Sequence, residues 1–208
     1  SDILKKEGKK GVFTPYLRNK ALGMIFTKSS TRTRVSFETG MAQLGGTALY
    51  LNANDMQLGR GEPIKDTARV LSRYLDGIMI RTYKHSDVEE LAEYGSIPII
   101  NGLTDYVHPC QVLADLQTIR EHKGTLTGLK MCFIGAGNNM ANSLINGGIL
   151  AGMEVACACP LEYLPDEEIT KRAQASGRFP LPQNVLEPPQ DADVHGPAVW
   201  ARMGEAPE

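Results

Sequence analysis

The fold is decided by residues 21–46, ALGMIFTKSSTRTRVSFETGMAQLGG. The stretch begins with an apolar run that predicts a strand, and a polar turn then leads into a helix of amphipathic pattern. Two adjacent glycines, Gly45 and Gly46, form a typical helix C-terminal signal. A buried strand that passes directly into a helix is the repeating unit of parallel α/β sheets.

The same alternation continues to about Gly177. The expected strands are short and mostly apolar on both faces, which is typical of strands covered by helices on both sides. They are Ala21–Phe26, Thr47–Leu51, Gly77–Thr82, Ile97–Asn101, Lys130–Gly135 and Glu154–Cys159. The expected helices cover about 31–44, 64–75, 86–94, 109–122, 139–150 and 165–175. We therefore predict an α/β protein with two doubly wound parallel-sheet domains and right-handed crossovers.

We place the domain boundary so that the first domain covers 1–122 and the second covers 123–208. From Arg178 onward the character of the chain changes, because six of its twelve prolines lie there. Proline disfavours both helices and central strands, so we expect the second domain to be truncated or irregular. Strand fragments are expected only at Ala192–Val194 and Ala198–Trp200.

Composition excludes several classes of protein. The 208 residues are 42% hydrophobic and 22% charged, which is ordinary for a globular chain, and the net charge of −2 provides no basic field for nucleic acid. No apolar run reaches the roughly 18 residues of a membrane-spanning helix. Four cysteines make no disulfide framework at this length and have no zinc-ligand spacing. We expect a cytoplasmic protein without a metal site.

The strongest candidate for a ligand-binding site is the segment KSSTRTR, residues 28–34. It opens the first expected helix, where backbone N–H groups carry partial positive charge. The hydroxyls of Ser30, Thr31 and Thr33 and the planar guanidinium of Arg32 suit phosphate or carboxylate oxygens. The alternative is a simple Ser/Thr helix cap flanked by solvated basic residues.

Two further polar groups follow expected strands. Arg81 ends the strand from Gly77, and His108-Pro109-Cys110-Gln111 follows the strand near Asn101 and begins a helix. Ligands of open α/β sheets bind outside the carboxyl ends of strands, so these groups are expected on one rim of one sheet. The alternatives are a surface arginine and a histidine that caps the helix.

The turn GAGNN at 135–139 resembles half of a dinucleotide-binding fingerprint. Its third glycine is replaced by Met140, and no acidic residue ends the next strand. A nucleotide-binding oxidoreductase is therefore disfavoured, and Asn138 and Asn139 offer amides to a small polar ligand instead.

Taken together, these motifs resemble the carbamoyltransferases. The resemblance rests on STRTR at 30–34, Arg81 and HPCQ at 108–111, in this order and spacing. The segments QLGRGEPIKDTAR at 57–69 and GAGNNMANS at 135–143 match the ornithine branch. The resemblance implies a carbamoyl phosphate-binding first domain and an ornithine-binding second domain. It implies transfer of a carbamoyl group from carbamoyl phosphate to the δ-amine of ornithine, giving citrulline and phosphate, without metal or organic cofactor.

The resemblance also implies roles for individual residues. Ser30, Thr31, Arg32 and Thr33 would bind phosphate, and Arg81, His108 and Gln111 would polarise the carbamoyl group. Pro109 and Cys110 lie within the same carbamoyl phosphate motif, and Asn139 and Met203 would bind ornithine. Gln57 would reach the carbamoyl phosphate of a neighbouring subunit, because the family is a homotrimer with shared active sites.

The sequence departs from the family at its end. The branch motif Asp-Val-Trp-x-Ser-Met-Gly corresponds to AVWARMG at 198–204, so Ala198 replaces a substrate-binding carboxylate and Arg202 replaces a serine. The family's His-Cys-Leu-Pro motif does not occur in these 208 residues. We therefore expect either an incomplete chain or a degenerate member. Another amine acceptor, such as aspartate or putrescine, and a catalytically silent carbamoyl phosphate-binding protein are the alternative functions.

Overall fold

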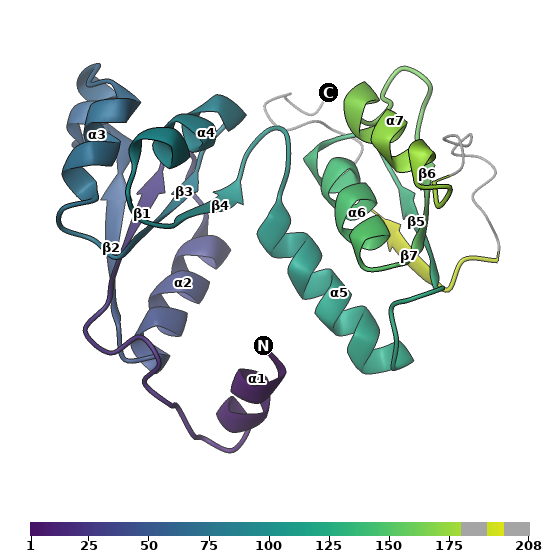
Figure 1. Ribbon diagram of the computed structural model, residues 1–208, viewed down its shortest axis with the longest axis horizontal. Coiled ribbons are helices and arrows are strands. Elements are labelled where there is room, and N and C mark those ends of the chain that lie inside the picture. The colour runs from purple at the N-terminus through teal and green to yellow at the C-terminus, as the bar shows by residue number, and fades with distance from the viewer. Residues whose placement is uncertain (180–190, 198–208) are drawn as a thin grey trace. The chain divides into compact units, whose positions relative to one another are not determined.

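The computed structural model describes residues 1–179 and 191–197. The chain divides into two compact units between Leu103 and Thr104, and each unit holds its own parallel sheet (Figure 1). The predicted α/β class with two parallel sheets is confirmed. The boundary after residue 122 stays a prediction.

The first unit contains a four-stranded sheet in the order β2-β1-β3-β4, with all neighbours parallel. Its elements in chain order are α1 (Asp2–Gly8), β1 (Ala21–Phe26), α2 (Thr31–Gln43), β2 (Thr47–Asn52), η1 (Ala53–Asp55), η2 (Gln57–Arg60), α3 (Ile64–Leu71), β3 (Gly77–Arg81), α4 (His85–Tyr94) and β4 (Ile99–Leu103).

Apolar side chains pack on both faces of this sheet. On one face, α3 and α4 pack over Ile25, Ile78 and Ile80, and on the other face α2 packs over Met24 and Met79. The chain runs outward from β1 to β2 and then returns to β3, so the direction of winding reverses between β1 and β3. The carboxyl ends of two such strands are where open α/β sheets bind ligands.

The second unit contains a three-stranded parallel sheet in the order β6-β5-β7. Its elements are α5 (Pro109–Lys123), β5 (Lys130–Ile134), α6 (Asn139–Leu150), β6 (Glu154–Ala158), α7 (Glu167–Ala175) and β7 (Val194–Pro197). Met131 and Phe133 of β5 form one apolar core with Ile145 of α6 and Ile169 of α7. Here the direction of winding reverses between β5 and β7.

The structure corrects several expected boundaries, among them the end of the helix expected at 64–75, which lies at Leu71. The strand expected at 97–101 begins at Ile99, because Pro98 has no N–H for the ladder. The strand expected at Ala192–Val194 begins at Val194, since the carboxylate of Asp193 binds the amide of Lys130 instead. The fragment expected at 198–200 lies outside the described residues. Helix α4 begins at His85 without a side-chain cap.

Candidate functional site

The first cluster of candidate residues lies at the N-terminus of α2, at the end of β1. Ser30 is the N-cap residue: its hydroxyl accepts from the amide of Thr33 at 3.3 Å and donates to the Thr33 hydroxyl at 3.0 Å. The amides of Thr31 and Arg32, in the first turn, have no acceptor within the helix. Both residues are exposed. This helix start therefore presents N–H donors, hydroxyls and a guanidinium to an anion.

Arg81 joins this cluster from the end of β3. Its Nη1 donates to the Thr33 hydroxyl at 3.2 Å, and its carbonyl accepts the amide of Thr27 at 3.0 Å. Burial lowers the pKa of Arg81, although a guanidinium remains charged in proteins. In the described part of the chain, its buried Nε has no hydrogen-bond partner. The switch point between β1 and β3 thus holds a fixed cation with unused donor capacity.

The other two cations of the segment 28–34 have different surroundings. Lys28 Nζ lies 5.0 Å from the ring centre of Tyr83, and its pKa is lowered by burial and then by the charge of Arg81. Arg34 forms an ion pair with Glu38 at 3.0 Å and stacks 3.8 Å over the ring of Tyr50. Arg34 is therefore held against β2, whereas Arg32 is exposed at the helix start.

Gln57 is exposed at the start of η2, in the segment between β2 and α3. The segment is a surface turn that ends at Gly61, whose φ of 97° is the left-handed conformation that glycine adopts most readily.

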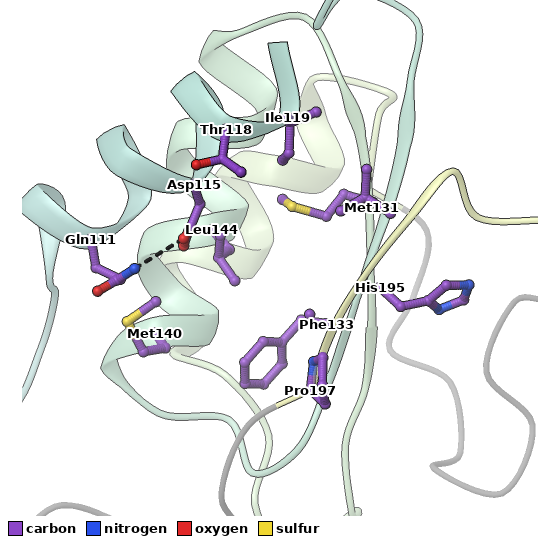
Figure 2. Close-up of a pocket in the computed structure, with 12 residues that line it drawn as sticks. Gln111, Asp115, Thr118, Ile119, Met131, Phe133, Met140, Leu144, His195 and Pro197 are labelled. Carbon is purple, nitrogen blue, oxygen red and sulfur yellow. Dashed lines mark hydrogen bonds between the residues drawn. The ribbon is translucent and has the colours of Figure 1, made fainter. Parts of the chain in front are cut away.

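The HPCQ motif forms the beginning of α5 in the second unit. His108 is the N-cap residue and Pro109 opens the helix, but the His108 side chain makes no capping hydrogen bond. Cys110 is half-buried, and burial raises the pKa of its thiol. The Gln111 side chain donates to Asp115 at 2.9 Å (Figure 2). It lines a groove of about 480 Å³ between α5, α6, β5 and β7.

Asn139 is buried in the first turn of α6. Its Nδ2 donates to the carbonyl of Thr104 at 2.7 Å, which leaves one N–H and the amide oxygen for other partners. It lines a cavity of about 310 Å³ together with Asn142 and the carboxylates of Asp105 and Asp166. Amides and carboxylates around a small cavity suit a polar molecule that carries an ammonium group.

The turn before α6 is closed to a dinucleotide. The amide of Gly137 donates to the Tyr163 carbonyl at 2.7 Å, and a side chain at Gly137 would overlap the backbone of Leu164 and Pro165. The oxygen of Asn138 already accepts the next two amides of the helix, those of Met140 and Ala141. A pyrophosphate needs these donors and this space. The geometry therefore agrees with the sequence in disfavouring nicotinamide binding.

The structure groups the candidate residues into two sets. Ser30, Thr33 and Arg81 are in direct contact in the first unit, and His108 and Asn139 belong to one hydrogen-bond network in the second. Met203, like Ala198 and Arg202, lies outside the described residues.

Sequence reasoning missed Asn142 and Ser143 of this network. Asn142 Nδ2 donates to the Tyr106 carbonyl at 3.0 Å. The signal that could have found these residues is the helical spacing of Asn139, Asn142 and Ser143 in a mostly apolar helix.

The part of the chain that the structure describes, residues 1–179 and 191–197, bears on two other classes of site. No group of three or more His, Cys, Asp or Glu side chains in this part could hold a metal ion. No helix in it is long and apolar enough to cross a membrane.

Known proteins similar to this chain define its class. The model of the aspartate/ornithine carbamoyltransferase carbamoyl-P binding domain matches residues 1–121. The model of the corresponding Asp/Orn binding domain matches residues 127–208. The chain therefore belongs to the aspartate/ornithine carbamoyltransferase family.

Individual relatives give more specific information than the family models do. An ornithine carbamoyltransferase of Carboxydothermus hydrogenoformans is 56% identical over 99% of this chain and 68% of its own length. The structure of the ornithine carbamoyltransferase from Pyrococcus furiosus has a TM-score of 0.90 and 52% identity, over 98% of this chain and 66% of that one. The catalytic subunit of M. jannaschii aspartate transcarbamoylase has a TM-score of 0.82 but 29% identity, over 96% of this chain and 67% of that one. The chain thus spans about two thirds of the length of its relatives.

Proposed function

We propose that the protein transfers the carbamoyl group of carbamoyl phosphate to the δ-amine of ornithine, giving citrulline and phosphate. The observation that carries the proposal is the contact between Arg81 and Thr33 at the start of α2, at the switch point of the sheet. It places a fixed cation beside a helix N-terminus, as a phosphorylated substrate requires. The high identity to proteins named ornithine carbamoyltransferase supports ornithine as the acceptor.

The proposed carbamoyl phosphate contacts come from the segment 30–33, from Arg81 and from the HPCQ motif. Ser30, Thr31, Arg32 and Thr33 bind the phosphate oxygens. Arg81, His108 and Gln111 hold and polarise the carbamoyl group, and Pro109 and Cys110 belong to the same motif in the first turn of α5. The amine nitrogen attacks the carbamoyl carbon, the bond from that carbon to the phosphate oxygen breaks, and the proton lost by the amine passes to the departing phosphate or to water. Negative charge grows on the carbonyl oxygen and on the departing phosphate, where preorganised cations and N–H groups stabilise it.

The residues proposed to bind the acceptor, ornithine, belong to the second unit. Asn139 binds the backbone groups of ornithine, and the polar cavity that it lines supports this role. Met203, in the segment 198–208, is the second residue proposed to bind ornithine. Gln57 reaches the carbamoyl phosphate of a neighbouring subunit in a homotrimer, and the exposed position of η2 supports this. Four free cysteines, at 110, 132, 157 and 159, support the cytoplasm as the compartment.

A second function is favoured by one observation. Ala198 and Arg202 stand where the ornithine branch has a carboxylate and a serine, so the α-amino group of ornithine lacks its counter-charge at that position. A protein with the intact set 30–33 and 81 but without that carboxylate would bind carbamoyl phosphate and transfer nothing.

One experiment separates the two. The purified 208-residue protein is titrated with carbamoyl phosphate in a calorimeter and then assayed for citrulline with ornithine, aspartate and putrescine as parallel acceptors. Citrulline formation with preference for ornithine is the expected result. Binding without turnover would favour the silent protein, turnover of another amine would change the acceptor, and no binding would refute both assignments.

A further inference from the structure

We infer that Ser143 is a positioning residue that couples His108 to Asn139, so that these two residues of the proposed site are held by one hydrogen-bond network. The inference rests on the proposed function for the roles of those two residues. Its physical basis is a hydrogen-bond network within the second unit, between the first turns of α6 and the loop 104–108.

Ser143 lies one turn after Asn139 in α6 and is 3% exposed. Its hydroxyl donates to the Asn139 carbonyl at 2.6 Å and accepts the amide of His108 at 2.6 Å. A serine hydroxyl has one proton to donate, and the bond to the preceding turn fixes where that proton points. Its lone pairs are thereby aimed at the N–H of His108.

This contact determines where His108 lies. His108 is the N-cap residue of α5, and the next residue, Pro109, has no N–H. The amide of His108 is therefore the anchor that binds the start of this helix to α6. The bond is partly buried, so leaving this amide without an acceptor would cost free energy, and the start of α5 is thereby held to Ser143.

The same loop is tied to α6 at two further points. Asn139 Nδ2 donates to the carbonyl of Thr104, four residues before His108. Asn142 donates to the carbonyl of Tyr106 in between, and its oxygen accepts the amide of Asp166. The residue proposed to hold ornithine and the residue proposed to polarise the carbamoyl oxygen are thus two ends of one network. A ligand that binds Asn139 and shifts its side chain therefore also shifts the backbone of the loop that contains His108.

The test compares Ser143→Ala with Ser143→Thr, which keeps the hydroxyl. Ser176→Ala is the matched control, because its hydroxyl also donates to a helix carbonyl, that of Ala173 at 2.6 Å, and accepts a later amide, that of Arg178 at 3.2 Å. Each variant of the 208-residue protein is titrated with carbamoyl phosphate, and amide hydrogen exchange of His108 is measured without ligand.

We expect Ser143→Ala to expose the His108 amide to exchange and to weaken carbamoyl phosphate binding by about five- to tenfold. Ser143→Thr should restore both properties, and Ser176→Ala should change neither, even though it removes a comparable pair of bonds. Unchanged affinity in Ser143→Ala, in a protein whose parent binds carbamoyl phosphate, would overturn this inference alone. A parent protein that binds no carbamoyl phosphate would overturn the proposed function, and the inference with it.

Discussion

Arg32 and Arg34 stand two residues apart in the same motif but have different surroundings. Arg32 is exposed at the start of α2, whereas Arg34 is held by Glu38 and stacked on Tyr50. We predict that Arg32→Ala weakens carbamoyl phosphate binding by about ten- to hundredfold, since a charge-assisted hydrogen bond contributes roughly 1.5–3 kcal/mol. Titration calorimetry measures this directly.

The matched control is Arg34→Ala, which removes the same charge from the same helix. Its affinity should stay within about twofold of the parent, because its guanidinium is engaged on β2, and its stability should fall by up to about 1 kcal/mol. Equal losses of affinity in the two variants would show that only net charge matters, and the phosphate pocket would have to be placed elsewhere.

At this scale the sequence predicts what is local and misses what depends on long-range contacts. The capping role of Ser30 follows from its place between a strand and a helix, and it is observed. The bond from Arg81 to Thr33 needs the order of the strands, which places β3 beside β1. The pairing of Ser143 with His108 joins residues 35 positions apart, and no spacing rule indicates it.

At the scale of elements, the turn between β5 and α6 depends on a glycine without a side chain. The loop after β6 crosses Gly137 so closely that a Cβ would overlap the backbone of Leu164 and Pro165. We predict that Gly137→Ala lowers the free energy of unfolding by about 1–3 kcal/mol, as overpacking against rigid backbone does. Denaturant titration measures it.

Gly40→Ala is the control for this prediction. Gly40 lies inside α2, and an added Cβ there meets nothing within 4 Å. Alanine is the better helix former by about 1 kcal/mol, so this variant should be as stable as the parent or more stable. If Gly137→Ala were equally stable, the loop after β6 would have to move freely away from the turn.

Elements with strong apolar runs or clear stop signals were predictable. Strand β1 begins and ends as expected, and α5 begins at Pro109 and is followed by Gly124 in the left-handed conformation. The short helix α1 and the two 3₁₀ turns after β2 were not predicted, because one or two turns of helix carry too little periodicity to recognise. Ser86 and Glu89 have the spacing of a capping box, but α4 begins at His85 and its N-cap residue, Lys84, makes no side-chain cap.

At the scale of the whole molecule, the chain has separate apolar cores in its two units, and each should determine the stability of its own sheet. Ile80 is 1% exposed in the core beneath α3 and α4, and Ile145 is fully buried in the core of the second unit. Replacing either with alanine should cost about 2–5 kcal/mol through lost burial and a residual cavity. We predict that Ile145→Ala raises amide hydrogen exchange in β5 and β6 while β1 and β3 keep their protection, and that Ile80→Ala does the reverse. Loss of protection in both sheets from either substitution would instead show that the two units unfold as one, and ligand binding in one would then stabilise the other equally.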